Sequence, residues 1–465
     1  MNHALEFENI SPVHGRICYR GRYLEEREAL EKLQISRRAQ HDCQQLPLSA
    51  RIEICGQFLR AFDEHLDENI RTLTWATGKP ISEARDEVAT MGFRTQALMD
   101  LAGQALKDEE LPRKNGTRRL IHREPLGVVL NIAAWNYPYV VPMNVVAAAI
   151  LAGNSVLLKH AVQSVQVGEQ IERAFAATDA PPGLVQNLMV DHLTVEKILQ
   201  TGHIGHVAFT GSVRGGAEVY RNVASAGFAS CGLELGGKDP AIVLDDAELG
   251  SAVDALVSGS FYNAGQSCCA VERIYVSKNI LSDFVEAFVE RTHTLQMGDP
   301  LSEETALGPV VSNKAARAIV EQTREAQLAG ARQVSSDHRF DIPALSDCYL
   351  PARVYVDVDH KMALMREESF GPVIGIMPFD DEEHAIDLAN DSHLGLTASV
   401  WTQDEERALR IMHRLQAGTV YMNRCDAVDP ELPWVGAKNS GLGHSLSVLG
   451  IQSLTRPKSF QLKSS

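Results

Sequence analysis

The chain has 465 residues, about three times the usual length of one domain, so we expect two large domains. Its 44 Lys and Arg against 60 Asp and Glu give a net charge of −16, which disfavours binding to nucleic acid or anionic membranes. The N-terminus lacks the basic start and apolar stretch of a secretory signal, and no run is long and apolar enough to span a bilayer. We therefore expect a cytoplasmic protein.

The eight cysteines do not suggest a disulfide framework in a chain of this length. No cysteine or histidine cluster has the spacing of a zinc site, so we expect a reducing compartment and no metal. Only the adjacent pair Cys268 and Cys269, in a segment with Gly, Gln and Asn, suggests chemistry.

From Leu48 to about Leu106, apolar residues recur three and four positions apart, which predicts helices. The Thr77–Pro80 turn interrupts them. Beyond Arg123, short apolar runs alternate with amphipathic segments. This pattern predicts strands in LGVVLNI, SVLLK, LVQNLMV, HVAFTG and CGLELGG, with helices around 141–151, 163–176, 194–200 and 215–224.

A second alternation begins near Pro240 with AIVL and continues through RIYV, PVIGIMPF, ASVW and GTVYMN. Strands alternating with helices are typical of parallel sheets covered on both faces, which commonly bind dinucleotides. We predict an α/β fold with two Rossmann-like doubly wound domains, formed by residues 1–110 with 125–234 and by residues 235–436. Residues 111–124 and 452–465 lie outside both and are predicted to form strands that pair with each other or with another subunit.

The strongest candidate for catalysis is Cys268, in the segment FYNAGQSCCA. A thiol at the end of a polar, glycine-containing turn is more accessible than a thiol in a core. From the segment alone, the cysteine is either a nucleophile or a small buried side chain, which is the commoner fate of a free cysteine.

Two further polar residues interrupt strand-like runs. Glu234 is an isolated carboxylate in CGLELGG; burial raises the pKa of such a group, as a general base near neutral pH requires. A structural ion pair or an outward-facing position explains it equally well. Asn136 lies in the sharp loop AAWNYP, where its amide either donates to a developing oxyanion or is an ordinary turn residue.

Together these segments resemble the aldehyde dehydrogenase superfamily, in its non-acylating NAD(P)-dependent branch. The resemblance runs from about Leu48 to the C-terminus, and the 34 positions from Glu234 to Cys268 match the spacing of the family. Further motifs stand in family order: Thr77-Gly78-Lys79-Pro80, Leu158-Lys159, Phe209-Thr210-Gly211-Ser212, Glu367-Glu368-Ser369-Phe370-Gly371-Pro372 and Ser440-Gly441-Leu442-Gly443.

The resemblance implies that the Cys268 thiolate attacks an aldehyde and forms a thiohemiacetal. The Asn136 amide and the Cys268 backbone N–H would stabilise the oxyanion, hydride would pass to the nicotinamide, and Glu234 would activate the water that hydrolyses the thioester. It also implies an NAD(P)-binding first domain, a catalytic second domain, and a homodimer or dimer of dimers formed through the hairpin and tail.

By the same resemblance, the cofactor residues are Trp135, Lys159, Phe209, Gly211, Ser212, Glu368 and Phe370. The sequence departs from the family pattern at two places that affect the expected cofactor and substrate contacts. Val162 stands where NAD-preferring relatives often have a glutamate, so the choice between NAD and NADP stays open; His160 nearby is expected to be a neutral surface residue. His444 and Ser445 replace the usual Arg-Glu, which puts the family's contacts there in doubt.

Asn144 occupies the position eight residues after Asn136 where semialdehyde-specific relatives often carry an arginine, which argues against a small anionic substrate. The other expected substrate contacts are Cys269 and the apolar or aromatic residues Tyr137, Tyr139, Val140, Met143 and Trp434. Core positions are the better interpretation for Val140 and Met143. We expect an aliphatic or aromatic aldehyde; a semialdehyde of a small carboxylate is the alternative.

Three rival functions remain. A CoA-acylating relative generally lacks the glutamate seen here as Glu234, whose presence favours hydrolysis. A cysteine hydrolase that paired Cys268 with a histidine would not need a nucleotide fold. A non-catalytic nucleotide-binding member of the fold would not need Asn136, Glu234 and Cys268 together.

Overall fold

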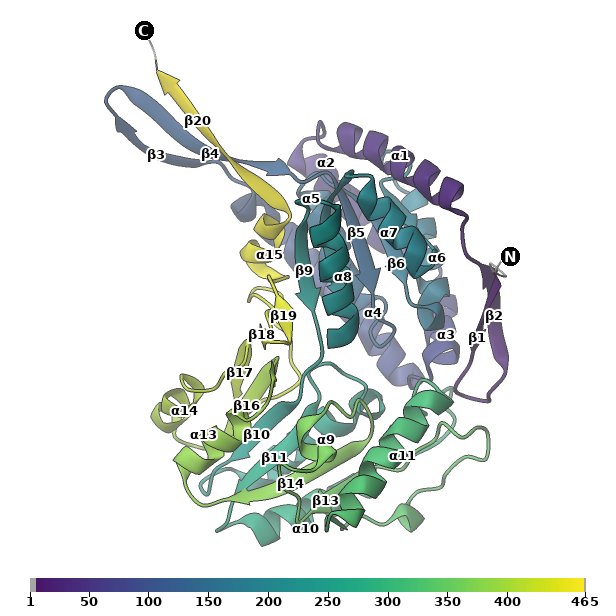
Figure 1. Cartoon of the computed structure of the whole chain (residues 1–465), viewed down its shortest axis with the longest axis vertical. Helices are drawn as coiled ribbons and strands as arrows, with labels where there is room; N and C mark the ends of the chain where they lie inside the picture. The colour runs from purple at the N-terminus through teal and green to yellow at the C-terminus, as the bar shows by residue number, and fades with distance from the viewer. Residues whose placement is uncertain (1–5, 464–465) are drawn as a thin grey trace.

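The computed structural model describes residues 6–463 of the chain. Its helices and strands form two lobes and a three-stranded sheet that projects away from both (Figure 1). Residues 1–5 of the predicted first domain and residues 464–465 of the predicted tail lie outside the described residues. The predicted α/β class is confirmed, because each lobe is built on one mainly parallel sheet with helices packed against it.

The first lobe contains a six-stranded sheet of order β19-β9-β8-β5-β6-β7, in which only β19 is antiparallel to its neighbour. Every residue of β6 is buried, because α1, α5 and α6 pack against this strand; α7 and α8 lie on one face of the sheet and α2 and α4 behind the other (Figure 1). The strands are β5 (Val128–Ala133), β6 (Ser155–His160), β7 (Val185–Asn187), β8 (Ile204–Thr210), β9 (Ser230–Glu234) and β19 (Gly441–Leu442). The helices are α1 (Glu26–Cys43), α2 (Leu48–Asp63), α3 (Leu66–Thr77), α4 (Ile81–Ala105), α5 (Val140–Leu151), α6 (Val165–Ala176), α7 (His192–Gln200), α8 (Val213–Ala226), α15 (Ser447–Ser453) and the 3-10 turn η1 (Val162–Ser164).

The second lobe contains a seven-stranded sheet of order β12-β13-β14-β11-β10-β16-β17, in which only β12 is antiparallel to its neighbour. The strands are β10 (Asp239–Val243), β11 (Val271–Ser277), β12 (Arg332–Gln333), β13 (Arg353–Val356), β14 (Val373–Phe379), β16 (Thr397–Trp401) and β17 (Thr419–Met422). The helices are α9 (Leu249–Phe261), α10 (Leu281–Thr292), α11 (Asn313–Leu328), α12 (Ala363–Arg366), α13 (Glu382–Asn390), α14 (Glu405–Met412) and the 3-10 turns η2 (Tyr262–Gly265) and η3 (Asp337–Arg339). The short strands β15 (Leu394–Gly395) and β18 (Ala437–Lys438) pair with each other beside the sheet.

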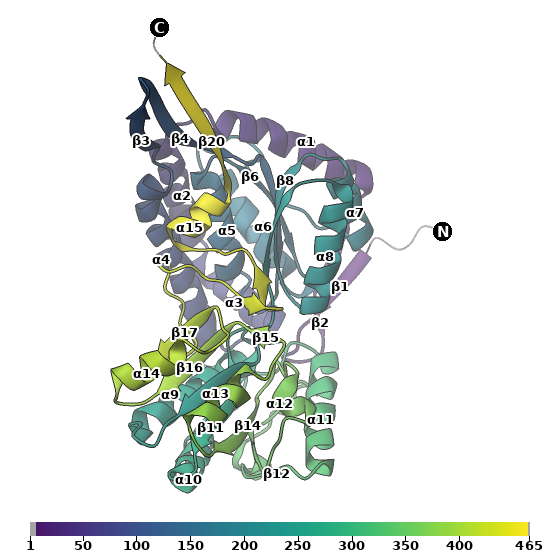
Figure 2. The same ribbon diagram turned by 60° about the vertical axis from the view of Figure 1, so that its left-hand side comes forward.

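After β17 the chain returns to the first lobe. There β19 pairs with β9, with Gly441 opposite Glu234, and α15 packs against α4. The chain then forms β20 (Thr455–Lys463), which pairs along its whole length with β4 (Thr117–Pro125), the partner of β3 (Glu109–Lys114). The expected pairing of the two outlying segments with each other is thus observed, and Figure 2 shows these three strands extending beyond the first lobe.

Several parts of the fold were not predicted, including the N-terminal segment and one edge of the second sheet. Residues 6–43 form the hairpin β1 (Glu6–Ile10) and β2 (Ile17–Arg22) followed by α1, and β12 with β13 forms one edge of the second sheet. Across residues 6–463, no helix is both long and apolar enough to cross a membrane.

Candidate active site

Cys268 and Glu234 line the same cavity, of about 450 Å³, where the two lobes meet. Glu234 ends β9 of the first lobe, whereas Cys268 lies in the loop between η2 and β11 of the second. The other lining residues are Asp86, Glu87, Thr90, Arg94, Tyr137, Val140, Val141, Asn144, Thr210, Ala255, Ser258, Gly259, Tyr262, Ser267, Cys269, Asn423, Arg424, Cys425, Asp426, Val428 and Trp434. Each lobe thus supplies one of the two reactive groups.

The loop that carries Cys268 is fixed by the amide of Gln266. Its Nε2 donates to the carbonyl of Asn263 (3.0 Å), and its Oε1 accepts the N–H of Val311 (2.7 Å). Gly265 adopts a φ of 71°, and a Cβ at this position would lie 2.3 Å from the carbonyl oxygen of Gly371. Only glycine fits this conformation and this close approach. The Cys268 thiol is therefore held at the end of a rigid turn, on the cavity wall.

Asn136 contacts the same loop from the first lobe. Its Nδ2 donates to the carbonyl of Gln266 (3.1 Å), two residues before Cys268, and leaves the second amide hydrogen available. The backbone N–H of Cys268 has no acceptor among residues 6–463. A buried amide and an unpaired backbone N–H next to a thiol are the donors that a developing oxyanion requires.

Glu234 is held by both its backbone and its side chain. Its carbonyl accepts the N–H of Gly211 (3.0 Å), and its carboxylate accepts a hydrogen bond from Ser445 Oγ. Burial raises the pKa of Glu234, while the Ser445 hydroxyl and the charge of Arg94 oppose the rise. Ser445 is positioned by a β-bridge to Trp434, with two backbone hydrogen bonds of 2.9 and 3.0 Å. Ser445, which departs from the family pattern, thus contacts the predicted general base Glu234 directly.

Four of the predicted substrate residues, Tyr137, Asn144, Cys269 and Trp434, line the cavity. Met143 does not: it packs in the core of the first lobe, the interpretation that the sequence analysis preferred for it over a substrate contact. Tyr139 is also buried outside the cavity, where its hydroxyl donates to the carbonyl of Asn69 (3.1 Å). Val140 is buried and lines the cavity as well.

Five charged residues of the cavity were not predicted, namely Asp86, Glu87, Arg94, Arg424 and Asp426. Arg94, on α4, lines the cavity with Glu234 and both adjacent cysteines; burial lowers its pKa, and the charge of Glu234 partly opposes this. Asp426 follows β17 and accepts hydrogen bonds from Cys269 Sγ (2.9 Å) and Ser267 Oγ (3.4 Å); burial raises its pKa to about 6. No local motif marks either residue, because a helix arginine and a loop aspartate resemble solvated surface positions.

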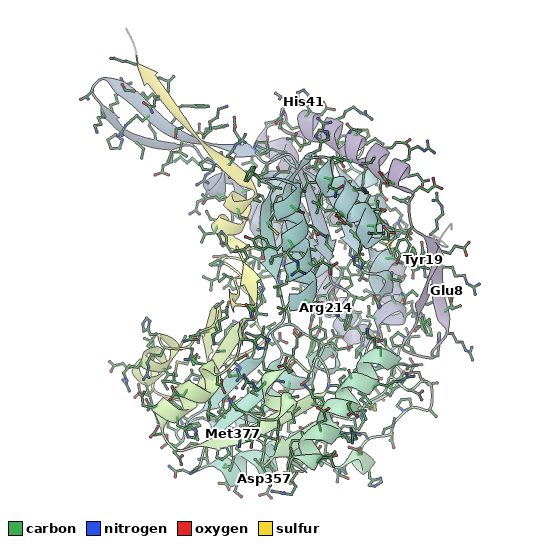
Figure 3. The ribbon with its side chains drawn as sticks, viewed as in Figure 1. Glu8, Tyr19, His41, Arg214, Asp357 and Met377 are labelled. Atoms are coloured by element: carbon green, nitrogen blue, oxygen red, sulfur yellow. The ribbon has the colours of Figure 1, made fainter. Side chains whose placement is uncertain are left out.

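The predicted phosphate-binding residues lie at the start of α8. Ser212 caps this helix by accepting the N–H of Gly215 (3.2 Å), and the N-terminal end of α8, near Arg214 in Figure 3, lies on the side of the second lobe. Cβ atoms added at Gly211 and Gly215 would lie 2.8 and 3.0 Å from the ring of Phe209. The turn therefore packs tightly on Phe209 and leaves free backbone N–H groups, which suit a diphosphate.

Lys159, the residue before the end of β6, is buried and has no hydrogen bond or ion pair to any residue from 6 to 463. Burial lowers its pKa, although Asp191 partly opposes this. An enclosed ammonium without a partner fits a hydroxyl-bearing ligand. His160 is corrected: it is buried, not on the surface, its Nε2 donates to the carbonyl of Pro138 (2.9 Å), and burial lowers its pKa to about 4.

Glu368 and Phe370 belong to a second-lobe loop that faces these groups. Glu368 accepts the N–H of Gly237 (3.2 Å), and burial raises its pKa to about 8. The ring of Phe370 lies edge-on to Trp135, with ring centroids 5.5 Å apart. With the α8 turn and Lys159, this loop supplies the helix end, polar groups and aromatic surface that a nicotinamide dinucleotide requires, so the residues fit that cofactor.

Comparisons with known proteins agree with this geometry. The model of the aldehyde dehydrogenase family matches residues 1–460. A succinate semialdehyde dehydrogenase of Escherichia coli is 38% identical over 396 residues, which cover 85% of this chain and 84% of that protein. A betaine aldehyde dehydrogenase of Sinorhizobium fredii is 32% identical over 456 residues, which cover 97% and 92%.

Among solved structures, a betaine aldehyde dehydrogenase of Staphylococcus aureus in complex with NAD⁺ superposes with a TM-score of 0.89. It is 27% identical, and the match covers 98% of this chain and 91% of that one. The family expected from the sequence motifs is confirmed over nearly the whole chain. This chain belongs to the aldehyde dehydrogenase family.

Proposed function

We propose that the chain oxidises an aldehyde to its carboxylic acid with NAD or NADP, through a thioester on Cys268 that is hydrolysed with the help of Glu234. The observation that carries the proposal is the shared cavity, which places the thiol and the carboxylate on its wall. The Asn136 amide, bonded to Gln266 two residues before Cys268, adds a donor at the same loop. A cysteine hydrolase would need neither the dinucleotide-binding residues nor Glu234.

In the first step, the sulfur of Cys268 adds to the carbonyl carbon of the aldehyde, and the carbonyl oxygen becomes the oxyanion of a thiohemiacetal. The second amide hydrogen of Asn136 and the N–H of Cys268 stabilise this charge. A bound nicotinamide would supply the hydride acceptor that conversion of the thiohemiacetal to the thioester requires. Trp135, Glu368 and Phe370 would hold the ring, Ser212 and the α8 turn would hold the diphosphate, and Lys159 would hold the adenosine ribose.

In the second step, Glu234 removes a proton from water, whose oxygen attacks the thioester carbon. The carbon–sulfur bond breaks, the acid leaves, and the sulfur of Cys268 regains a proton. The raised pKa of Glu234 makes the carboxylate a stronger base than an exposed glutamate. The presence of this group supports transfer of the acyl unit to water, not to CoA.

The relatives differ in the charge of the aldehyde for which they are named: succinate semialdehyde is anionic and betaine aldehyde is cationic. The side chains of Tyr137, Val140 and Trp434 give this cavity apolar and aromatic surface, which supports an aldehyde with an aliphatic or aromatic chain. Val162, at the start of η1, brings no carboxylate to the predicted ribose site and is compatible with both cofactors.

The projecting sheet supports self-association as a dimer or a dimer of dimers. Its outer strands β3 and β20 leave backbone groups unpaired, and β20 exposes Phe460 and Leu462. Such edges pair readily with another chain. The eight unpaired cysteines support a reducing compartment such as the cytoplasm.

The test is absorbance of the reduced nicotinamide after purified protein is mixed with aldehydes and NAD or NADP, without CoA. The wild type and Cys269→Ala are expected to form reduced cofactor over many turnovers, whereas Cys268→Ala forms none. Turnover by Cys268→Ala, or a strict requirement for CoA, contradicts the proposal.

A further inference from the structure

The turn before Cys268 is left-handed over three consecutive residues. Asn263 (φ 52°, ψ 35°) and Ala264 (φ 54°, ψ 35°) precede Gly265 (φ 71°). In this conformation the Cβ of an L-residue lies too close to the following carbonyl oxygen, and of the three residues only Gly265 lacks a Cβ. Such residues persist where the surrounding structure holds them. Contacts from outside the turn are therefore expected to hold Asn263 and Ala264.

Helix α4 of the first lobe supplies two of these contacts. The carboxyl of Glu83, in the first turn of α4, accepts the backbone N–H of Asn263 at Oε2 (2.9 Å), and both residues are buried. This is the one hydrogen bond that the carboxyl receives from residues 6–463. Three residues further along α4, Asp86 accepts the hydroxyl of Tyr262 (3.4 Å). The helix thus contacts two successive residues at the start of the turn.

The side chain of Asn263 connects this turn to the oxyanion loop. Its Nδ2 donates to the carbonyls of Asn136 (3.3 Å) and Gln266 (3.3 Å). The Gln266 carbonyl also accepts the side-chain amide of Asn136 (3.1 Å). Because Glu83 holds the backbone of Asn263, a shift at that contact would move both proposed oxyanion donors, the Asn136 amide and the backbone N–H of Cys268.

Glu83 differs from Glu87, which lies one turn later on α4. Glu87 forms an ion pair with the ammonium of Lys79 and accepts the N–H of Tyr139 (2.8 Å). Glu83 has no ion pair with any residue from 6 to 463, and burial raises its pKa to about 8, although the charge of Lys79 opposes the rise. Most Glu83 side chains are therefore protonated at neutral pH. The group serves as a neutral hydrogen-bond acceptor and not as half of a salt bridge.

We propose that Glu83 is a positioning residue for the oxyanion site. By holding Asn263, it keeps the Asn136 amide and the Cys268 N–H directed at the same point. The inference rests on the proposed function and adds a residue that does not line the cavity. Glu83 belongs to the first lobe and Asn263 to the second, so their hydrogen bond also fixes the nucleophile loop relative to the lobe that carries Asn136.

The first test is steady-state kinetics of the full-length enzyme with the fastest aldehyde among butanal, benzaldehyde, succinate semialdehyde and betaine aldehyde. Glu83→Ala removes the acceptor and is expected to lower kcat by about 100-fold, the effect of displacing reacting groups by roughly 1 Å. The KM for the cofactor should stay unchanged, because the proposed cofactor contacts lie on other loops. Glu83→Gln keeps a neutral acceptor oxygen and should retain most of the kcat.

The matched control is Asp100→Ala, the loss of an exposed carboxylate on the same helix that accepts only the side chain of Gln96 (2.9 Å). It should behave as the wild type. Equal kcat losses in Glu83→Gln and Glu83→Ala, or a cofactor KM that rises as much as kcat falls, would overturn the proposal, because either result indicates a general disturbance of the fold.

Relief of the backbone strain gives a second test. Glycine adopts left-handed backbone freely, so adding Ala264→Gly to Glu83→Ala should recover about 10-fold of the lost kcat. No recovery would contradict the proposal. If Glu83→Ala does not fold, Asn263→Gly tests the next contact: it keeps the left-handed backbone but lacks the amide that reaches Asn136. We expect a similar loss of kcat there, and a wild-type kcat would contradict the proposal.

Hydrogen exchange followed by mass spectrometry tests the contact without turnover. The backbone amides of residues 262–268 should exchange faster in Glu83→Ala than in the wild type, whereas Glu83→Gln should preserve their protection. Unchanged exchange in Glu83→Ala would overturn the proposal. If no aldehyde gives reduced cofactor with the wild type while exchange changes as expected, the proposed function has failed and the role of Glu83 in holding the turn has not.

Discussion

Breaking the buried ion pair of Lys238 and Glu272 should affect two properties at once: the stability of the protein and the position of the loop that carries the proposed cofactor contacts. Lys238 Nζ lies 2.5 Å from Glu272 Oε2, with side-chain exposures of 0% and 4%. Glu272 also accepts the backbone N–H groups of Ser369 (2.8 Å) and Phe370 (2.9 Å). This carboxylate therefore holds the loop that carries the proposed nicotinamide contacts.

Glu272→Gln removes the charge and leaves the Lys238 ammonium enclosed beside only the hydroxyl of Ser369. Breaking a buried pair on one side costs about 3–5 kcal/mol, a large part of the roughly 5–15 kcal/mol that stabilises a typical protein. Urea unfolding followed by tryptophan fluorescence should show this loss. The KM for the cofactor should rise in the same variant, because an NH2 donor replaces one of the two oxygens that accept the backbone N–H groups of Ser369 and Phe370.

The control is Glu303→Gln, which breaks the exposed pair with Arg85 and should cost less than about 1 kcal/mol. The double variant Lys238→Met with Glu272→Gln should be less destabilised than Glu272→Gln alone, since no buried charge is left unpaired. A loss below about 1 kcal/mol for Glu272→Gln with an unchanged cofactor KM would refute the reasoning.

Three further predictions concern the site and the projecting sheet. In Ser445→Ala, Glu234 loses a donor that stabilises its charged form, so its pKa rises further and the rising limb of the pH–kcat profile moves to higher pH; an acid shift would contradict this. Asn136→Ala should lower kcat by about 100- to 1000-fold with little change in cofactor KM, measured by steady-state kinetics. Removal of residues 455–465 should leave monomers in light scattering, and an unchanged mass would place the interface elsewhere.

The central strands were predictable because a strand buried on both faces needs a continuous apolar run, as in β6 and β11. Strand β19 was not, since its two residues are held only by pairing with β9, more than 200 positions away in the sequence. The sequence also could not separate cavity from core positions on α5. This helix is apolar on all sides, so its periodicity could not show that Val140 and not Met143 faces the cavity.

The candidate site also contains both residues that local motifs could predict and residues that only the folded structure reveals. Local motifs identified Cys268, Glu234 and Asn136 as candidates, because each interrupts a strand or turn pattern with a reactive or polar group. Arg94 and Asp426 enter the cavity only because α4 and the loop after β17 pack around the thiol. Their neighbours in the cavity are distant in the sequence, so no local sequence pattern identifies them.

The central claim is that Cys268, and not its neighbour Cys269, carries the acyl group. The most direct measurement is peptide mass spectrometry of Glu234→Gln quenched after mixing with cofactor and an aldehyde, because slow hydrolysis should let the thioester accumulate. We expect one acyl group on Cys268, with one equivalent of reduced cofactor formed in the first turnover. An acyl group on Cys269, or reduced cofactor formed at full rate with no acyl group on either cysteine, would contradict it.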